Sequence, residues 1–257
     1  AGIGFGFDTD EEIAPADYYS RFRISETEFD SLKERHVFSF RGNIESLPDF
    51  GNILFSSSEQ SVYEYGDGYA RVLNRFDTQS YKCVCFQSPH KPGGEIYFTR
   101  GGETARRTEA ELFRIIDLFS ALLFYDAFII HGSAVELDGK VCIFSGDSGI
   151  GKSTQARLWK KHNGAQILNG DRVILRRVGD EWKACGLPMC GSSDICRVFS
   201  LPVQAVVFLG QARKNKVYIP DDFNKIMLTV SQSGCGTGKR EDSVKILSLA
   251  ESMAGSI

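Results

Sequence analysis

Nine consecutive residues in the middle of the chain could bind the phosphates of a nucleotide. They fit the pattern G-x-x-x-x-G-K-[ST], in which glycines let backbone N–H groups curl around phosphate oxygens. In such a loop the lysine reaches the β- and γ-phosphates, and the hydroxyl after it binds Mg²⁺. The residues are Gly146, Asp147, Ser148, Gly149, Ile150, Gly151, Lys152, Ser153 and Thr154. The sequence therefore predicts a site for ATP, or another nucleoside triphosphate, with Mg²⁺.

An acidic residue follows this loop at a short distance along the chain. Asp171 closes a short predicted strand, 165–171, nineteen positions after Lys152. A carboxylate there could bind Mg²⁺ together with Ser153, or act as a base toward an incoming hydroxyl. Gly170 before it leaves no side chain in the way of a substrate. The alternative is a turn aspartate that pairs with Arg172.

A histidine is expected beside the first glycine of the loop. Asp138-Gly139 between two apolar runs predicts a two-residue hairpin. If Leu137 pairs with Lys140, the register places His131 opposite Gly146. His131 would then contact phosphate or take part in catalysis, the alternative being a purely structural histidine. Asp147 would be repelled by phosphate, so we expect its side chain to point outward or toward an incoming group.

The elements around these residues predict a mixed α/β (α+β) fold. A helix over 154–162 should follow the loop and end near Asn163-Gly164, and a further helix should begin at Ser243. Strands are expected at 172–177, 182–186 and 203–209. The sequence after Pro220 is otherwise ambiguous, with a polar loop over 231–242.

The first part of the chain is rich in predicted strands and lacks a chemical motif. Alternating apolar residues and turn signals predict an antiparallel sheet with strands at 36–40, 52–56, 61–65, 69–76, 81–86 and 95–99. Thr108 and Glu111 then form a capping box before one core-facing helix that extends to Leu123. We therefore expect two regions: residues 1–103, β-rich and a candidate for substrate binding, and residues 104–257, a catalytic domain.

The net charge, the cysteines and the apolar stretches indicate which classes of protein to expect. The net charge of −3 shows no basic excess of the kind that binds nucleic acid. Seven cysteines, an odd number, favour reduced thiols and a cytoplasmic protein, and the spacing of Cys185, Cys190 and Cys196 matches no standard zinc module. We find no signal peptide, and charged residues interrupt the apolar stretch 112–130, so no membrane span is expected.

These pieces together resemble the catalytic domain of the HPr kinase/phosphorylase family, over about residues 128–178. The resemblance is carried by His131-Gly132, by the loop G-D-S-G-I-G-K-S at 146–153, and by Asp171-Arg172-Val173. It implies a P-loop core, which ATP-dependent phosphoenolpyruvate carboxykinase shares more distantly. It also implies an ATP-dependent kinase in which the aspartate activates a serine hydroxyl and the histidine lies near the phosphates.

Two departures from the family pattern bear on the substrate. Gly170 stands where the family has the first of two adjacent aspartates, and residues 191–197 replace the G-L-G-I signature of the HPr enzymes. HPr is therefore not the expected substrate, and phosphorylase activity is not expected to follow. The chain is more similar to HPr-kinase-like enzymes of peptide-modification clusters, including lasso-peptide tailoring kinases. This implies a peptide, protein or small-molecule hydroxyl as acceptor, and the family precedent allows a homo-oligomer.

Three functions remain open from the sequence. The first is a kinase with Lys152 on the phosphates, Ser153 and Asp171 at Mg²⁺, Asp171 as base, and Arg197 as a clamp on the acceptor or phosphate. The second is a non-catalytic or regulatory nucleotide-binding module, which the missing second aspartate favours. The third is a carboxykinase-like enzyme, which would need further metal- and carboxylate-binding residues.

Overall fold

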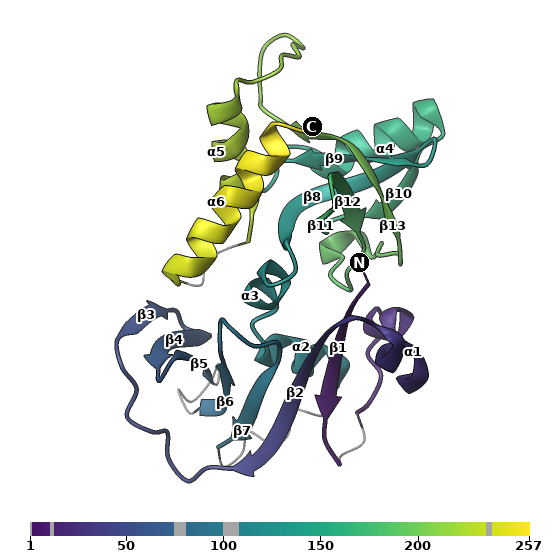
Figure 1. Cartoon of the computed structure of the whole chain (residues 1–257). Helices are drawn as coiled ribbons and strands as arrows, with labels where there is room; N and C mark the ends of the chain where they lie inside the picture. The colour runs from purple at the N-terminus through teal and green to yellow at the C-terminus, as the bar shows by residue number, and fades with distance from the viewer. Residues whose placement is uncertain (1, 11–12, 75–80, 100–107, 235–237) are drawn as a thin grey trace. The chain divides into compact units, whose positions relative to one another are not determined.

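The chain folds into two compact units. A computed structural model describes residues 2–10, 13–74, 81–99, 108–234 and 238–257. The C-terminal unit comprises Asp126–Cys235 and Ser243–Ile257, and the N-terminal unit comprises Gly2–Tyr125 and Gly236–Asp242 (Figure 1). The predicted boundary lay at 103/104, whereas the units divide after Tyr125, so that the helices of residues 109–123 belong to the N-terminal unit. Each unit contains helices and one mixed sheet, as an α/β fold requires.

The strands of the C-terminal unit form a sheet of six. They are β8 (Ala127–Leu137), β9 (Lys140–Ser145), β10 (Gln166–Asn169), β11 (Arg172–Val178), β12 (Glu181–Cys185) and β13 (Ser200–Phe208). Their order is β10-β8-β11-β12-β13-β9, and β9 also pairs with β8, so the pairing closes on itself. The β13–β9 pair is parallel and the others are antiparallel.

The predicted hairpin is confirmed. Leu137 pairs with Lys140, and the register continues through Val135 and Cys142 to Gly132 and Ser145. Asp138 and Gly139 have φ values of 53° and 77°, the left-handed conformation that a two-residue hairpin turn needs at both positions. This turn fixes which residues of β8 and β9 lie opposite one another.

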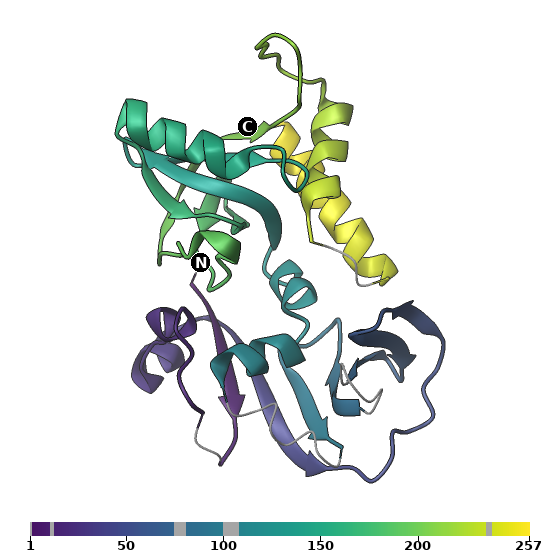
Figure 2. The ribbon, with the colours of Figure 1, turned by 180° about the vertical axis from the view of Figure 1, so that it is seen from behind.

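Three helices belong wholly or mostly to the C-terminal unit: α4 (Lys152–Asn163), α5 (Asp222–Gln232) and α6 (Arg240–Ala254). Helix α4 ends at Gly164, whose φ is 71°, as the Asn-Gly pair predicts. Its Trp159 packs against Phe144 of β9, within a cluster that includes Val135 and Ala156. Figures 1 and 2 both show α5 beside α6. The sequence did not predict α5, and α6 begins three residues before the predicted Ser243.

The N-terminal unit contains a seven-stranded sheet in the order β1-β2-β7-β6-β5-β4-β3. The strands are β1 (Ile3–Asp8), β2 (Glu34–Asn43), β3 (Ile53–Ser56), β4 (Gln60–Tyr65), β5 (Gly68–Asn74), β6 (Tyr81–Gln87) and β7 (Gly94–Phe98). Six of them match predicted strands. The prediction of a purely antiparallel sheet is wrong, because β1 pairs with β2, and β2 with β7, in parallel. The first strand, β1, was not predicted.

Short helices complete this unit: η1 (Tyr19–Phe22), α1 (Glu26–Ser31), α2 (Glu109–Ile115) and α3 (Leu118–Leu123). The single helix predicted after Thr108 is therefore two helices. Thr108 Oγ1 accepts a hydrogen bond from the backbone of Glu111, which is half of the predicted capping box, and donates to the carboxylate of Glu111. The helix breaks at Asp117, because this residue is the N-cap of α3 and accepts from the backbone of Ser120.

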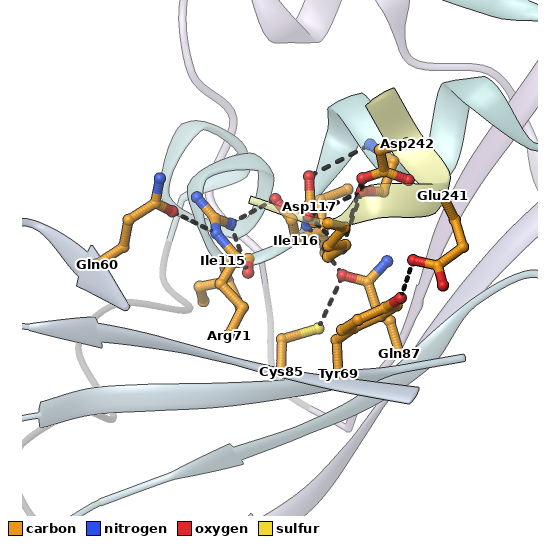
Figure 3. A network of polar contacts seen from close by, with 12 residues as sticks. Gln60, Tyr69, Arg71, Cys85, Gln87, Ile115, Ile116, Asp117, Glu241 and Asp242 are labelled. Atoms are coloured by element: carbon orange, nitrogen blue, oxygen red, sulfur yellow. Dashed lines mark hydrogen bonds and ion pairs between the residues drawn. The ribbon is translucent and has the colours of Figure 1, made fainter. Parts of the chain in front are cut away.

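A network of buried polar contacts holds the break in place (Figure 3). Arg71 of β5 donates to the main-chain oxygens of Arg114, Ile115 and Ile116, which are left without helical partners where α2 ends. Lys239 lies 2.7 Å from the carboxylate of Asp117, and both side chains are about 95% buried, with exposed fractions of 4% and 5%. The break between α2 and α3 is thus stabilised by residues that lie far away in the sequence. The local spacing of apolar residues carries no information about such contacts.

Within the described ranges, no helix combines the length and the apolar composition that crossing a bilayer requires.

A buried histidine makes the stability of the N-terminal unit depend on pH. His36 of β2 accepts at Nδ1 from the backbone of Gly93 and contacts the main-chain oxygen of Ala121 through Nε2, so the ring is neutral. Burial lowers the pKa of His36 to about 4. Below the unfolded-state pKa of about 6.5, the unfolded chain binds a proton that the folded chain does not. Stability should therefore fall as the pH falls from about 6.5 to about 4, by up to about 3 kcal/mol.

Urea unfolding of the wild type and of His36→Gln at pH 7, 5.5 and 4.5 measures this effect. The glutamine variant is expected to be less stable at pH 7 but to lose less stability on acidification. Equal pH dependence in the two proteins would show that His36 does not cause the loss.

Candidate functional site

Strand β8 joins the parts of the candidate site. Its first half, up to His131, pairs with β11, and its second half, from Gly132, pairs with β9 on one edge and with β10 on the other. The backbone N–H of Gly132 donates to Asp171 O at 2.8 Å, and Ser145 Oγ donates to His131 O at 2.7 Å. A Cβ on Gly132 would lie 2.7 Å from a side-chain methyl of Ile143, so this position of β8 requires glycine. The strand thereby brings the start of β11 to the end of β9.

The predicted phosphate loop has the backbone that its glycines predict. Gly146, Gly149 and Gly151 have φ values of 136°, 79° and 113°, which side chains with a Cβ rarely adopt. The loop leads from β9 directly into α4, which begins at Lys152. It therefore lies at a helix N-terminus, where free backbone N–H groups and the helix dipole favour anions. Ser153 and Thr154, in the first turn of α4, are exposed.

Lys152 is held at the loop by main-chain oxygens. Its Nζ donates to Gly146 O and to Asp147 O, each at 2.9 Å. Burial lowers the pKa of Lys152, while the carboxylates of Asp171 and Asp147 act in the opposite direction. The carboxylate of Asp171 is thus one of two that favour the charged form of Lys152.

Asp171 lies between a histidine and an arginine. Its Oδ1 is 3.4 Å from His131 Nε2, and its Oδ2 is 3.5 Å from Arg172 Nε. The turn that carries it is fixed by Asn169, a fully buried residue whose Oδ1 accepts from the backbone N–H groups of Asp171 and Arg172. Sequence reasoning missed Asn169, although an asparagine two residues before the acid is a turn signal. The pairing with Arg172 that the structural alternative predicts is present, and its role as Mg²⁺ ligand or base stays a prediction.

His131 is neutral near pH 7. Its pKa is lowered, first by burial and then by the positive charge of Lys152, and the carboxylate of Asp171 only partly offsets this. An uncharged imidazole can accept as well as donate a hydrogen bond. The structure thus brings together His131, Lys152 and Asp171, three residues selected from the sequence.

The space above Gly170 is not open, contrary to the sequence-based expectation. A Cβ on Gly170 would lie 2.0 Å from Ser193 Oγ. Ser193 belongs to a short turn, η3 (Gly191–Ser193), and its hydroxyl donates to Cys190 O at 2.6 Å. Gly191 in this turn has a φ of 53°, and a Cβ there would lie 2.8 Å from the carboxylate carbon of Asp171. The turn therefore packs directly against Gly170 and Asp171.

The remaining predicted residues lie around this centre. Arg197 donates through Nε to Ile167 O of β10, and its role as a clamp stays a prediction. Asp147 is exposed, and its carboxylate accepts from Gln232, which the sequence did not single out. Cys185, Cys190 and Cys196 are buried and form no disulfide bond. Among the described residues, no three His, Cys, Asp or Glu side chains form a group that could hold a metal by themselves.

Magnesium bound with a nucleotide needs fewer protein ligands than a closed metal site. It keeps several waters and is held by one or two protein oxygens together with phosphate oxygens. The exposed hydroxyl of Ser153 and the carboxylate of Asp171 have the hard oxygen chemistry that this arrangement requires.

Comparisons with known proteins give weak similarity. No protein-family model matches the chain, and no curated protein matches it. Among solved structures, the chain is similar to the Hpr(Ser) kinase/phosphatase from Coxiella burnetii, with 17% sequence identity and a TM-score of 0.27. The match covers 35% of this chain and 69% of that chain. At this TM-score the similarity decides nothing about function.

The contact between Gly170 and Ser193 predicts a coupled pair of substitutions. Gly170→Ala should lower the free energy of unfolding by about 1–3 kcal/mol, because the new methyl group overlaps Ser193 Oγ. Adding Ser193→Gly removes the obstructing atoms and should restore part of the loss. Urea unfolding of the single and double variants measures the coupling.

Gly210→Ala is the matched control, since a Cβ there meets nothing within 4 Å. It should change stability by less than about 0.5 kcal/mol. If Gly170→Ala changes the free energy of unfolding as little as Gly210→Ala does, the turn does not fill the space above Gly170.

Proposed function

We propose that the chain is an ATP-dependent phosphotransferase that moves the γ-phosphoryl group of ATP to a hydroxyl. The observation that carries the proposal is the position of Asp171, beside His131 and within electrostatic range of Lys152 at the glycine loop. A phosphate-binding loop alone supports nucleotide binding. A carboxylate next to it supports transfer, because an acceptor hydroxyl needs a group that takes its proton.

The binding step rests on the loop. Backbone N–H groups of Gly146–Thr154 and the N-terminus of α4 would contact the phosphates, and Lys152 would exchange its main-chain partners for β- and γ-phosphate oxygens. Ser153 and Asp171 would hold Mg²⁺ with the phosphates. When bound, Mg²⁺ supplies charge neutralisation on the phosphate oxygens.

The transfer step rests on Asp171. The acceptor oxygen would form a bond to the γ-phosphorus as the bond to the β,γ-bridging oxygen breaks, and ADP leaves with that oxygen. The hydroxyl proton would pass to the carboxylate of Asp171. Neutral His131, 3.4 Å from this carboxylate, would orient it without adding a positive charge that competes for the phosphates.

The acceptor is proposed by class. A peptide, a protein or a small molecule with a hydroxyl fits the chemistry, and the N-terminal unit is a candidate for binding it. A cytoplasmic location and a homo-oligomer stay predictions.

A nucleotide-binding module without catalysis is the second candidate. The side chain of Ser193 occupies the space above Gly170, and Asp171 has Arg172 as a neighbour. Both contacts are those expected of an aspartate with a structural role, in a module that binds a nucleotide without catalysing transfer. No comparable observation favours a carboxykinase-like enzyme.

Substitution of Asp171 separates the two candidates. Asp171→Asn keeps the size and removes the charge, so Mg-ATP should bind within about tenfold of the wild type while transfer slows at least ~100-fold. The measurements are calorimetric titration with Mg-ATP and transfer of labelled γ-phosphate to acceptors in a cell extract. Lys152→Ala is the contrasting variant, because loss of the ammonium should weaken ATP binding itself.

Three other outcomes have distinct meanings. Rescue of Asp171→Asn by excess Mg²⁺ would show that Asp171 acts only as a metal ligand and not also as the base. A lower melting temperature with full activity per folded molecule would make it a structural partner of Arg172. Nucleotide binding by the wild type without transfer to any acceptor would support the binding module.

A further inference from the structure

The end of helix α5 contacts the phosphate loop through one side chain. Gln232, the last residue of α5, donates from Nε2 to Asp147 Oδ1 at 3.2 Å, although the two residues are 85 positions apart. Both belong to the C-terminal unit. Asp147 is the second residue of the loop, so the contact reaches the loop itself.

The backbone that carries Gln232 is fixed to the strand that carries His131. Ser233 forms a bridge with Ile130, and Gly234 N donates to Ile129 O at 3.2 Å. Ser233 N also bonds to Thr229 O and Val230 O, which closes the last turn of α5. The amide of Gln232 is therefore presented to Asp147 from a backbone position that β8 defines.

Asp147 poses an electrostatic problem for a phosphate loop. Its carboxylate would repel a triphosphate, and its place as the second residue of the loop keeps its main chain next to the phosphates. The side chain must therefore be directed away from the phosphates by a partner. A neutral amide donor can do this without adding a second charge that would attract or repel the nucleotide.

We propose that Gln232 is a positioning residue that holds the carboxylate of Asp147 away from the bound triphosphate. The inference rests on the proposed function, since it concerns the same loop. Gln232 acts through Asp147 and touches neither the acceptor nor the transferred group. It should therefore affect nucleotide affinity and leave the rate of the transfer step nearly unchanged.

Titration of four proteins with ATP and with inorganic tripolyphosphate tests the proposal. Gln232→Ala should bind both ligands about three- to tenfold more weakly, the size expected for one like-charge contact near the surface. Gln232→Glu keeps the shape but replaces the donor with a second carboxylate, so it should bind more weakly still. Ser231→Ala is the matched control, because Ser231 lies in the same helical turn and its hydroxyl donates to Leu228 O within α5.

Two further readouts distinguish this role from a general loosening of α5. The defect of Gln232→Ala should shrink as salt rises from about 0.05 to 0.5 M, because salt screens charge repulsion. The binding defect should also fall below about twofold when Asp147→Asn is added to both the wild type and Gln232→Ala and the two are compared, because the repelling charge is then gone. A structural defect would persist in both tests.

Failure of the inference and failure of the proposed function give different results. If the wild type binds ATP and Gln232→Ala binds it equally well, or if the defect persists in the Asp147→Asn background, the inference is overturned and the proposed function stands. If the wild type binds neither ATP nor tripolyphosphate, the proposed function fails and this inference fails with it.

Discussion

The candidate site depends on the place in strand β8 where the pairing with β11 ends and the pairing with β9 begins. His131 is the last residue of β8 that pairs with β11, and Gly132 is the first that pairs with β9, while β10 pairs with the same half of β8 as β9 does, from the other edge. The residue before β11 is Asp171 and the residue after β9 is Gly146, so this place brings an acid and a glycine loop to one point. Because side chains alternate along a strand, a slip of one residue would turn His131 to the other face. The Asp138-Gly139 turn prevents this slip by fixing the pairing of Leu137 with Lys140.

The charged groups around this point leave the phosphate loop as the position at which an anion would bind. Lys152 supplies positive charge at the N-terminus of α4, where the helix dipole adds to it. His131 is kept neutral by burial and by Lys152, so it does not draw phosphate away from the loop. Of the two nearby carboxylates, Asp171 is held between His131 and Arg172, and Asp147 by Gln232. Under the proposed function, a triphosphate entering the loop would take the place of the main-chain oxygens of Gly146 and Asp147 at Lys152.

Local signals in the sequence were sufficient for much of this arrangement. The Asp-Gly turn and the apolar runs on either side predicted β8 and β9, and the spacing of glycines predicted the loop and α4. Sequence reasoning failed where a contact joins distant residues. Ser193 fills the space above Gly170, Gln232 reaches Asp147, and Lys239 pairs with the aspartate that divides α2 from α3. The parallel pairing of β1 is also long-range, because no turn beside a strand specifies a partner reached through a crossover.

The proposed function requires that the loop at Gly146–Thr154 binds the triphosphate of a nucleotide with Asp171 facing its γ-phosphate. A crystal structure of the chain with Mg²⁺ and a non-hydrolysable ATP analogue would test this requirement. We expect β- and γ-phosphate oxygens within hydrogen-bond distance of Lys152 Nζ and of the loop N–H groups, with the carboxylate of Asp171 on the side of the γ-phosphate. A nucleotide bound elsewhere, or a loop that stays free of phosphate at saturating analogue, would contradict it.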